Sequence, residues 1–375
     1  MNVFPQPPND MTAKPTVLIT GVSGKVGSHL LSQLEDYQVI GVDVQAPAAA
    51  DAMFRFETID LAEERSCDQL LELIRAYRPE AVAHLAFVTR QPQNGATDPQ
   101  NMWSSNVVGT SRVIEAIAEH NRTIGGVEKF IFSSSAAVYG PEPQPPVREE
   151  SPLQAQSLPY ALQQQEADQT VQSRAGELRK CKTYVLRPHV YAGALASNYM
   201  LDMLRGLPGT RRSLGRRLGR RGVRLPLIVS SRGNNLDHKY QFVHLGDMAR
   251  LIANIVRRKQ VDDPLTLLNV AGRGDPLSLR RCAEIAAIQI KQLPTRSLGL
   301  RTLRLLWDLG VSDIPPAALP YLYGSCALDT SRLRIFLGEN YRSAIQHTSE
   351  EALIESLKPR AAEETAGVPG EPVNA

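Results

Sequence analysis

The segment TVLITGVSGKVGSHLL, residues 16–31, constrains the fold more than any other part of the chain. Its apolar run Val17–Ile19 is typical of a strand that is buried on both faces. Three glycines follow at a spacing of three: Gly21, Gly24 and Gly27. Residues 25–34 then place apolar side chains at helical spacing. The order of strand, glycine turn and helix predicts one unit of a parallel sheet covered by helices.

The glycine turn also predicts a site for a phosphate group. Gly21 permits a tight turn, Gly24 lets a phosphate approach the backbone, and Gly27 lets the helix lie close to the strand. The free N–H groups at the start of the helix would then face a pyrophosphate. The spacing differs from the G-x-G-x-x-G pattern of dinucleotide sites, so the interpretation depends on the elements that follow the turn.

Two acids after the next strands extend this interpretation. A second apolar strand, 39–43, ends in Asp43, which lies 22 residues after Gly21. An acid at this place accepts hydrogen bonds from the ribose hydroxyls of adenosine and repels a 2′-phosphate, which favours NAD over NADP. Asp60 follows a third strand, and we favour its contact with the adenine over a role as a helix N-cap.

Strands and helices alternate through the first half of the chain. Strands are predicted at 54–59, 81–86, 130–132 and 183–186, and helices at 66–77 and 102–120. This alternation predicts an α/β fold with a doubly wound parallel sheet, in which ligands bind at the carboxyl ends of the strands. In the second half we expect strands at 240–244 and 265–270 and a helix at 248–257 that begins at Asp247.

A serine cluster and a tyrosine supply a second set of chemical groups. Ser133–Gly140 follows the fifth strand directly, and Pro159–Glu166 begins a helix about twenty residues later with Tyr160 in its first turn. A phenol and a serine hydroxyl beside a nicotinamide could move a proton to or from a substrate carbinol. Taken singly, each residue is equally well explained as a loop serine or a packing tyrosine.

Together these segments resemble the extended short-chain dehydrogenase/reductase family, and within it the NAD-dependent epimerases and dehydratases that act on nucleotide sugars. The resemblance runs from about residue 15 to 357. Its motifs are Thr20–Gly27, Asp43, Asp60-Leu61, His84–Ala86, Asn106–Thr110, Ser133–Gly140, Tyr160, Arg187-Pro188 and Phe242–Asp247. It implies a Rossmann domain with a small C-terminal α/β substrate lobe, a bound NAD, and a homodimer formed through helices 102–120 and 160–175.

The resemblance also implies roles for individual residues. Ser135, Tyr160 and, in the usual lysine position, Gln164 match the catalytic set, and Ser135 would contact the substrate. The cofactor would be bound by Gly21, Ser23, Gly24, Lys25, Val26, Gly27, Asp43, Asp60, Leu61, Leu85, Ala86, Phe87, Tyr160, Gln164 and His189.

The sequence departs from this family at two positions. Gln164 can hydrogen-bond a ribose but brings no positive charge to lower the pKa of Tyr160, which is about 10 in a free tyrosine. We therefore keep two alternatives, a working enzyme with an altered acid–base step and an NAD-binding sensor or scaffold without turnover. Val190 stands where an asparagine often holds the sugar diphosphate, and Asn198 is a candidate replacement. A reductase of a small or sterol-like carbonyl is a third alternative.

The expected domain organisation follows from these segments. We expect a disordered tail at 1–15, an NAD-binding domain at 16–190, and mostly a substrate-binding lobe at 191–357. A strand and helix near 240–257 would return to the Rossmann sheet, and a second disordered tail would cover 358–375.

Composition limits the other classes of function. The net charge of +3 gives no general case for nucleic acid, and the four cysteines lack metal-ligand or disulfide spacing, which suits a cytoplasmic protein. No metal site is predicted, and no apolar run is long enough to cross a membrane.

An arginine-rich loop at 210–225 contains seven arginines, no acid and three glycines that should interrupt a helix. We leave open an anion-binding lid, contact with anionic lipid or nucleic acid, and a solvated insertion. The amphipathic stretch 298–309 is expected to be a helix that faces the core.

Overall fold

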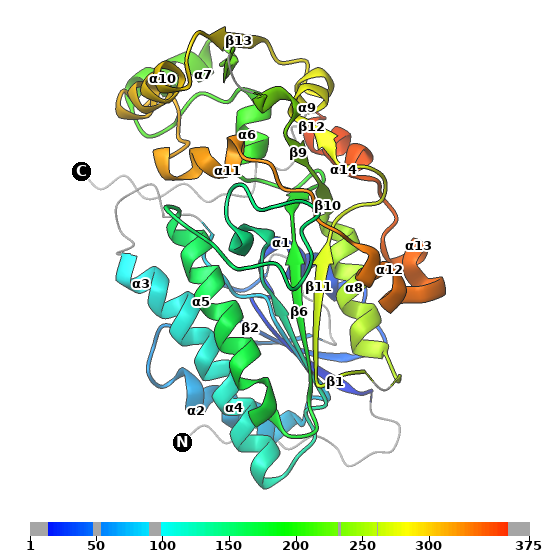
Figure 1. Cartoon of the computed structure of the whole chain (residues 1–375). Helices are drawn as coiled ribbons and strands as arrows, with labels where there is room; N and C mark the ends of the chain where they lie inside the picture. The colour runs from blue at the N-terminus through cyan, green and yellow to red at the C-terminus, as the bar shows by residue number, and fades with distance from the viewer. Residues whose placement is uncertain (1–13, 48–53, 90–98, 232–233, 261, 359–375) are drawn as a thin grey trace, which may run out of the picture.

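The computed structural model describes residues 14–47, 54–89, 99–231, 234–260 and 262–358 (Figure 1). Its centre is a seven-stranded parallel sheet with the strand order β11-β6-β5-β4-β1-β2-β3. The strands are β1 (Thr16–Thr20), β2 (Gln38–Asp43), β3 (Phe54–Thr58), β4 (Ala81–His84), β5 (Lys129–Ser133), β6 (Lys182–Pro188) and β11 (Leu265–Val270). The predicted doubly wound parallel sheet is therefore confirmed.

Helices cover both faces of the sheet. On one face lie α1 (Lys25–Leu31), α8 (Leu245–Arg257), α12 (Ser331–Leu337) and α13 (Tyr341–Ala344). On the other lie α2 (Ser66–Tyr77), α3 (Pro99–Trp103), α4 (Gly109–Thr123) and α5 (Pro159–Arg174). Successive side chains of a strand point to opposite faces, so Val17 packs in the first layer and Leu18 in the second. This double burial explains why the strands are apolar almost throughout.

The strand order reverses between β1 and β4, which are neighbours in the sheet. At such a switch point the loops after the two strands run in opposite directions and leave a crevice at the carboxyl end of the sheet. Here the loops are the glycine turn after β1 and residues 85–89 after β4.

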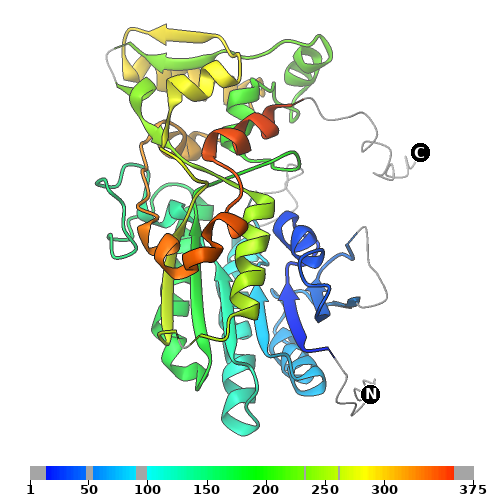
Figure 2. The same ribbon diagram turned by 90° about the vertical axis from the view of Figure 1, so that its right-hand side faces the viewer.

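A smaller lobe lies beyond the carboxyl ends of the strands (Figures 1 and 2). Its helices are α6 (Tyr199–Arg205), α7 (Ser213–Arg220), α9 (Leu279–Ile285), α10 (Arg296–Asp308), α11 (Leu319–Tyr323) and α14 (Ser349–Leu357). Its strands form three pairs: β7 (Val190–Ala192) with β10 (Phe242–His244), β9 (Lys239–Tyr240) with β12 (Leu277–Ser278), and β8 (Leu227–Ser230) with β13 (Ile290–Leu293). All of these elements except α7 and α10 contribute to a separate apolar cluster.

The returning segment differs from the expectation. The predicted strand 240–244 divides into β9 and β10, and β10 pairs with β7 and not with the main sheet. The seventh strand of the sheet is β11, which pairs with β6, while α8 packs beside α1 on the sheet. The NAD-binding domain, which we expected to end at residue 190, thus also includes α8 and β11. Helix α8 also begins earlier than predicted, because His244 and not Asp247 is its N-cap and accepts from the N–H of Gly246.

Three helices differ from their predictions in other ways. The expected helix 102–120 contains a π-helical segment, Ser104–Val108, between α3 and α4. Part of the arginine-rich loop folds as α7 despite its glycines. The stretch 298–309 is helical as α10, but much of its apolar surface faces outward and not into the core. Among the described residues, no helix has the length and apolar content needed to cross a membrane.

Candidate functional site

A cavity of about 480 Å³ opens at the carboxyl end of the sheet, between the switch point and the smaller lobe. Most of the predicted site residues line it: Gly21, Gly24, Lys25, Val26, Gly27, Leu85, Phe87, Ser135, Tyr160, Gln164, His189 and Asn198. These residues come from six separate segments of the chain, which the parallel sheet brings to one edge.

The glycine turn is packed so closely against neighbouring backbone that no side chain fits at Gly21 or Gly27. Gly21 has a φ of +74°, and a Cβ placed there would lie 2.4 Å from the backbone nitrogen of Ala86. A Cβ on Gly27 would lie 2.5 Å from the carbonyl oxygens of Gly21 and Val22. The two glycines let β1, α1 and the loop after β4 approach one another closely, so backbone atoms form the floor of the crevice.

Asp43 lies on the outer side of this turn. Its Oδ2 accepts from the N–H of Ser23 at 3.0 Å, and its Oδ1 accepts from the N–H of Val44 at 2.8 Å. The acid at the end of β2 is thereby fixed to the glycine turn. The other predicted residues outside the cavity wall are Ser23, Asp60, Leu61 and Ala86.

Asp60 does not cap a helix. Its Oδ1 accepts from the N–H of Ala62 at 2.9 Å, while helix α2 begins at Ser66 and has Arg65 as its N-cap. The local turn explains the backbone there, and the N-cap alternative is wrong. Leu61 is buried, and a Cβ on Gly109 would lie 2.9 Å from its Cβ.

Ser135, Tyr160 and Gln164 form the polar centre of the cavity. Pro159 starts α5 and places Tyr160 in the first turn, one turn before Gln164. Burial raises the pKa of the Tyr160 phenol, and hydrogen bonds with Ser135 and Gln164 oppose that rise only in part. Phe87 packs edge-on against the Tyr160 ring, with 5.8 Å between ring centroids. The amide oxygen Oε1 of Gln164 is buried and has no hydrogen-bond partner among the described residues.

His189 and Asn198 also line the cavity, but protein groups already occupy Nδ1 of His189 and both polar side-chain atoms of Asn198. Nδ1 of His189 accepts from the N–H of Gln241 at 3.0 Å, and burial lowers the pKa of this histidine to about 4. Its Nε2 therefore carries the proton at neutral pH. Asn198 is the N-cap of α6: its Oδ1 accepts from Leu201 at 3.0 Å, and its Nδ2 donates to the carbonyl of Tyr191 at 2.9 Å.

Residues 17–271 match the NAD dependent epimerase/dehydratase family. This chain belongs to that family. The match covers the whole sheet from β1 to β11 and every predicted site residue. It therefore agrees with the resemblance that the sequence motifs indicate.

Relatives of this family member include UDP-glucose 4-epimerases. The chain is 29% identical to UDP-glucose 4-epimerase 1 of Oryza sativa subsp. japonica over 52% of its own length and 56% of the relative's. It is 30% identical to the UDP-glucose 4-epimerase of Erwinia amylovora over 52% of its own length and 58% of the relative's. The chain therefore spans little more than half the length of these two relatives. The fold is similar to that of Bordetella bronchiseptica WbmH in complex with NAD+, with a TM-score of 0.62 at 20% identity over 92% and 97% of the two chains.

Several wall residues of this family member were not predicted from the sequence. Tyr191 is half-buried on β7, and its hydroxyl lies 3.2 Å from that of Ser133 at the end of β5. Tyr321 and Leu322 come from α11 of the smaller lobe. The one signal in the sequence that could have identified Tyr191 is its position two residues after His189, which was predicted.

A buried ion pair lies behind the cavity and was also not predicted. Arg187 of β6 donates from Nε and Nη2 to the carboxylate of Asp168 on α5, at 2.9 and 2.8 Å. The same carboxylate accepts from Ser134, the residue before Ser135. This network joins β6 and α5, which carries Tyr160 and Gln164, to the segment after β5, which carries Ser135.

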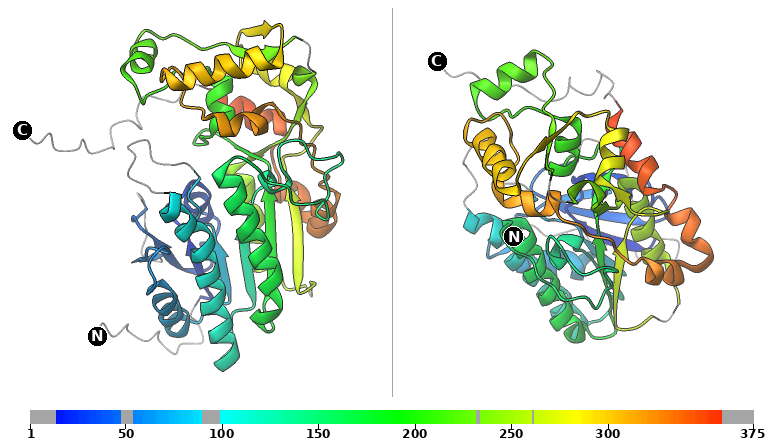
Figure 3. Two further views of the ribbon diagram at one scale, coloured as in Figure 1. Left: turned by 60° about the vertical axis from the view of Figure 1, so that its left-hand side comes forward. Right: turned by 45° about the horizontal axis from the view of Figure 1, so that its top comes forward.

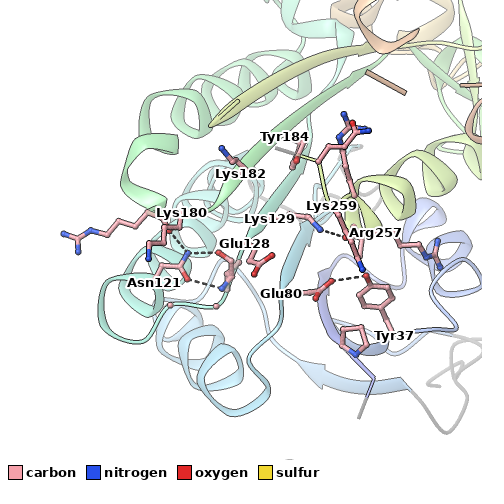
Figure 4. Close-up of a pocket in the computed structure, with 18 of the residues that line it drawn as sticks. Tyr37, Glu80, Asn121, Glu128, Lys129, Lys180, Lys182, Tyr184, Arg257 and Lys259 are labelled. Atoms are coloured by element: carbon pink, nitrogen blue, oxygen red, sulfur yellow. Dashed lines mark hydrogen bonds between the residues drawn. The ribbon is translucent and has the colours of Figure 1, made fainter. Parts of the chain in front are cut away.

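A larger hollow, of about 930 Å³, lies at the opposite, amino-terminal end of the strands (Figure 4). Lys129, Lys182 and Lys259 are among its cationic wall residues, and Lys129 donates to the carbonyl of Val256. Tyr37 donates to Glu80 at 2.9 Å at its edge. None of the predicted site residues line this hollow. Because ligands of parallel sheets bind at the carboxyl ends, we place the functional site in the smaller cavity.

Proposed function

We propose that this protein binds NAD at the switch point and transfers hydride at a carbinol or carbonyl carbon of a substrate held beneath the smaller lobe. The observation that carries the proposal is the convergence of Ser135, Tyr160 and Gln164 on the cavity whose floor is the glycine turn. Membership of an NAD-dependent family supports the cofactor, and the residues present fit it.

The fit to NAD rests on three features of the site. The glycine turn brings backbone N–H groups at the start of α1 to the cavity, as a pyrophosphate requires, and its Gly21 and Gly27 allow a close backbone packing that no Cβ would permit. Asp43 stands beside that turn with a carboxylate for the adenosine ribose. The unpartnered Oε1 of Gln164 would accept a hydrogen bond from a hydroxyl of the nicotinamide ribose. The cofactor, when bound, supplies the hydride acceptor or donor.

The protein groups would manage the substrate proton. Ser135 is placed to hold the substrate oxygen and Tyr160 to pass the proton, since both side chains line the cavity and the Ser135 hydroxyl lies close enough to Tyr160 to oppose the rise of its pKa. The raised pKa of Tyr160 keeps its phenol protonated at neutral pH. The protonated phenol is the form that can donate a proton when a carbonyl is reduced, whereas oxidation of an alcohol needs the phenolate, which is scarce at neutral pH.

No other described residue of the cavity wall supplies the missing base. The described wall contains no carboxylate, and its one histidine, His189, has its Nδ1 occupied and its pKa lowered to about 4. Oxidation would therefore be slow near neutral pH. If no substrate is reduced either, the lack of a base in the cavity wall favours the second alternative from the sequence, an NAD-binding sensor or scaffold without turnover.

For the substrate, we propose a nucleotide sugar, on the analogy of the UDP-glucose 4-epimerases that the chain is similar to. One observation favours an uncharged carbonyl compound as a second candidate. The single cation in the described cavity wall is Lys25 of the glycine turn, and the substrate end is lined by groups such as Leu158, Met200 and Leu322. The arginines of residues 211–224 do not line the cavity, so nothing in the cavity wall supports the anion-binding lid considered above.

We also propose a homodimer formed through α3, α4 and α5. Trp103 and Leu162 leave 41% and 45% of their surface exposed on α3 and α5, which are bridged by a hydrogen bond from Trp103 to Glu166. Apolar side chains on neighbouring helices are suited to a partner surface. Light scattering should give twice the chain mass, and Trp103→Glu with Leu162→Glu should return it to the chain mass. A monomer for the unaltered protein would refute the dimer.

The test of the function has two stages. Calorimetry should detect binding of NAD or NADH to the unaltered protein, and absence of heat with both would refute the cofactor assignment. The absorbance of reduced nicotinamide should then fall when UDP-4-keto sugars or small ketones are added with NADH, and Tyr160→Phe should abolish the fall without loss of NADH binding. Activity unchanged in Tyr160→Phe would refute the role of the phenol. Binding without any turnover would favour the sensor.

A further inference from the structure

We propose that helices α7 and α10 form a docking surface for an anionic lipid membrane. The surface, called here the α7–α10 face, consists of the outward side chains of these two helices and of Val223 just after α7. It lies at the outer end of the smaller lobe, away from the sheet (Figure 1 and Figure 3). The inference is independent of the proposed enzymatic function.

Helix α10 presents leucines to solvent. Its inner side packs against β8 and β13. Four leucines of α10 and its C-cap, Leu298, Leu300, Leu305 and Leu309, leave 44%, 43%, 55% and 44% of their surface exposed. Arg301 and Arg304 lie between them and are also exposed. A water-facing helix surface normally carries charged residues at these positions, so the leucines predict contact with an apolar medium.

Helix α7 lies beside the C-terminal end of α10 and adds arginines. The Arg211 guanidinium stacks on the Trp307 ring at 3.4 Å from its centroid, and the N–H of Gly209 donates to the carbonyl of Val311 at 2.7 Å. From this base, α7 and the residues that flank it expose Leu214, Arg216, whose side chain donates to the carbonyls of Thr210 and Arg211, and four further arginines. They are Arg212, Arg217, Arg220 and Arg221, whose side chains make no ion pair with any part of the chain that the structure describes.

The charge of the whole chain is segregated onto this face. Residues 207–225 and 296–309 contain ten arginines and one acid, Asp308, although the net charge of the chain is only +3. The rest of the chain is therefore net acidic. A cationic face on an acidic protein is attracted to an anionic surface in one orientation, with the sheet turned away from it.

The mixture of leucine and arginine identifies the anionic surface. Interfacial helices combine a basic polar face with leucine and tryptophan, which insert at the level of the lipid headgroups. A nucleic acid would bind the arginines and gain nothing from six exposed apolar side chains, and a second copy would place arginines against arginines. Because no residue of the α7–α10 face lines the cavity, docking would leave the cavity accessible.

The experiment is sedimentation of the full chain with vesicles of phosphatidylcholine alone or with one third phosphatidylglycerol, at low and high salt. We expect binding to the anionic vesicles, at least tenfold weaker binding to the neutral ones, and a steep loss at high salt. Arg217→Gln with Arg220→Gln and Arg221→Gln should weaken binding at least tenfold. Leu298→Ser with Leu305→Ser and Leu309→Ser should weaken it at least fivefold at unchanged charge.

Matched controls carry the same changes elsewhere on the surface. Arg65→Gln with Arg280→Gln and Arg342→Gln removes three exposed charges, and Ile335→Ser removes an isoleucine that is 81% exposed. Neither should alter vesicle binding, and all variants should keep the melting temperature of the parent. No binding of the unaltered chain, equal losses in the controls, or binding to RNA that exceeds binding to vesicles would overturn the proposal. The proposal would also be overturned if the triple leucine variant changed the oligomeric state of the protein but not its binding to vesicles.

Discussion

Arg187 and Asp168 form a two-pronged ion pair that protein encloses completely, with side-chain exposures of 1% and 0%. The remaining donor of the guanidinium, Nη1, reaches the Tyr139 hydroxyl and the carbonyl of Glu149, each at 2.8 Å. Burial alone would lower the pKa of Arg187, but the adjacent carboxylate more than offsets this and the pKa is raised. Arg187 is thus held in its charged form, and the pair fixes α5 against β6 directly behind the cavity.

Removing one charge of this pair should be costly. Asp168→Asn leaves the Arg187 charge buried and uncompensated, so we expect the free energy of unfolding to fall by about 3–5 kcal/mol in urea titrations. The matched control is Glu63→Gln, which breaks the exposed pair of Arg65 and Glu63 and should lower it by less than about 1 kcal/mol. Similar losses in the two variants would show that the buried pair does not hold the site together.

Supplying the charge that the sequence lacks should change the pH dependence. Gln164→Lys places a cation near Tyr160 and should lower the pKa of the phenol by roughly 1–3 units. If the protein oxidises an alcohol, the rate in the unaltered protein should rise with pH throughout the alkaline range, and the variant should reach its plateau earlier and be about tenfold faster at neutral pH.

The control for this charge is Gln164→Met, which removes the hydrogen bonds without adding a cation. Its pH profile should keep the alkaline rise of the unaltered protein. Stopped-flow absorbance of reduced nicotinamide measures both profiles. A profile of the lysine variant that coincides with that of the methionine variant would contradict the electrostatic explanation.

The last glycine of the turn, Gly27, should not tolerate the addition of even one methyl group. In Gly27→Ala the new Cβ would lie 2.5 Å from two backbone oxygens, which cannot move without opening the turn. We expect calorimetry to show NAD binding weakened by at least a hundredfold. Gly176→Ala is the matched control, because a Cβ there meets nothing within 4 Å. Unchanged affinity in Gly27→Ala would place the dinucleotide elsewhere.

The acid beside the turn should set the choice of cofactor. Asp43→Asn removes the charge that would repel a 2′-phosphate and weakens acceptance of ribose hydroxyls. NAD affinity should fall by about tenfold, equivalent to ~1.4 kcal/mol, while NADP affinity should rise. Parallel calorimetric titrations with the two cofactors measure the ratio. A ratio that stays constant would exclude Asp43 from the adenosine site.

His84 should make the folded protein sensitive to acid. It lies inside β4 between two threonines, with Nδ1 at 2.6 Å from Oγ1 of Thr20 and Nε2 at 3.0 Å from Oγ1 of Thr110. Thr110 donates its proton to the carbonyl of Asn106, so it accepts from Nε2 and the ring is neutral. Burial lowers the pKa of His84 to about 3 from 6.5.

The sign of the effect follows from this lowered pKa. Below pH 6.5, His84 binds a proton in the unfolded chain, whereas in the folded chain it stays neutral down to about pH 3. The free energy of unfolding therefore decreases as the pH falls through this range. Well below pH 6.5 the slope of unfolding free energy against pH should be smaller in His84→Gln than in the unaltered protein, by up to about 1.4 kcal/mol per pH unit. Equal slopes would contradict a buried neutral histidine.

Local patterns were sufficient to predict much of this fold. The runs of β1, β2, β4, β5 and β6 are apolar because both faces of the sheet are covered, and that burial is visible in the sequence. The glycine turn and Tyr160 were found because their chemistry depends on short spacings. Twelve of the site residues predicted from such spacings and from the family resemblance line one cavity in the structure.

Other features depend on contacts between distant segments and could not be predicted. Asp168 lies in the polar run QQQEADQT, and only its pairing with Arg187 distinguishes it from a surface acid. Helix α7 forms despite its glycines because Arg211, at its base, packs on Trp307 and donates to Asp313. That β11 joins the sheet, and β10 does not, is decided by pairing with β6 and β7.

The position of β11 has a consequence for biosynthesis. A ribosome that has released only the first 190 residues has released six of the seven strands, and the edge of β6 and one face of the sheet still lack β11 and α8. An uncovered parallel edge beside bare apolar surface is prone to aggregate. The nascent chain must therefore be sheltered until about residue 270 has left the exit tunnel, and nucleotide-binding fragments cut near residue 190 should be insoluble when expressed alone.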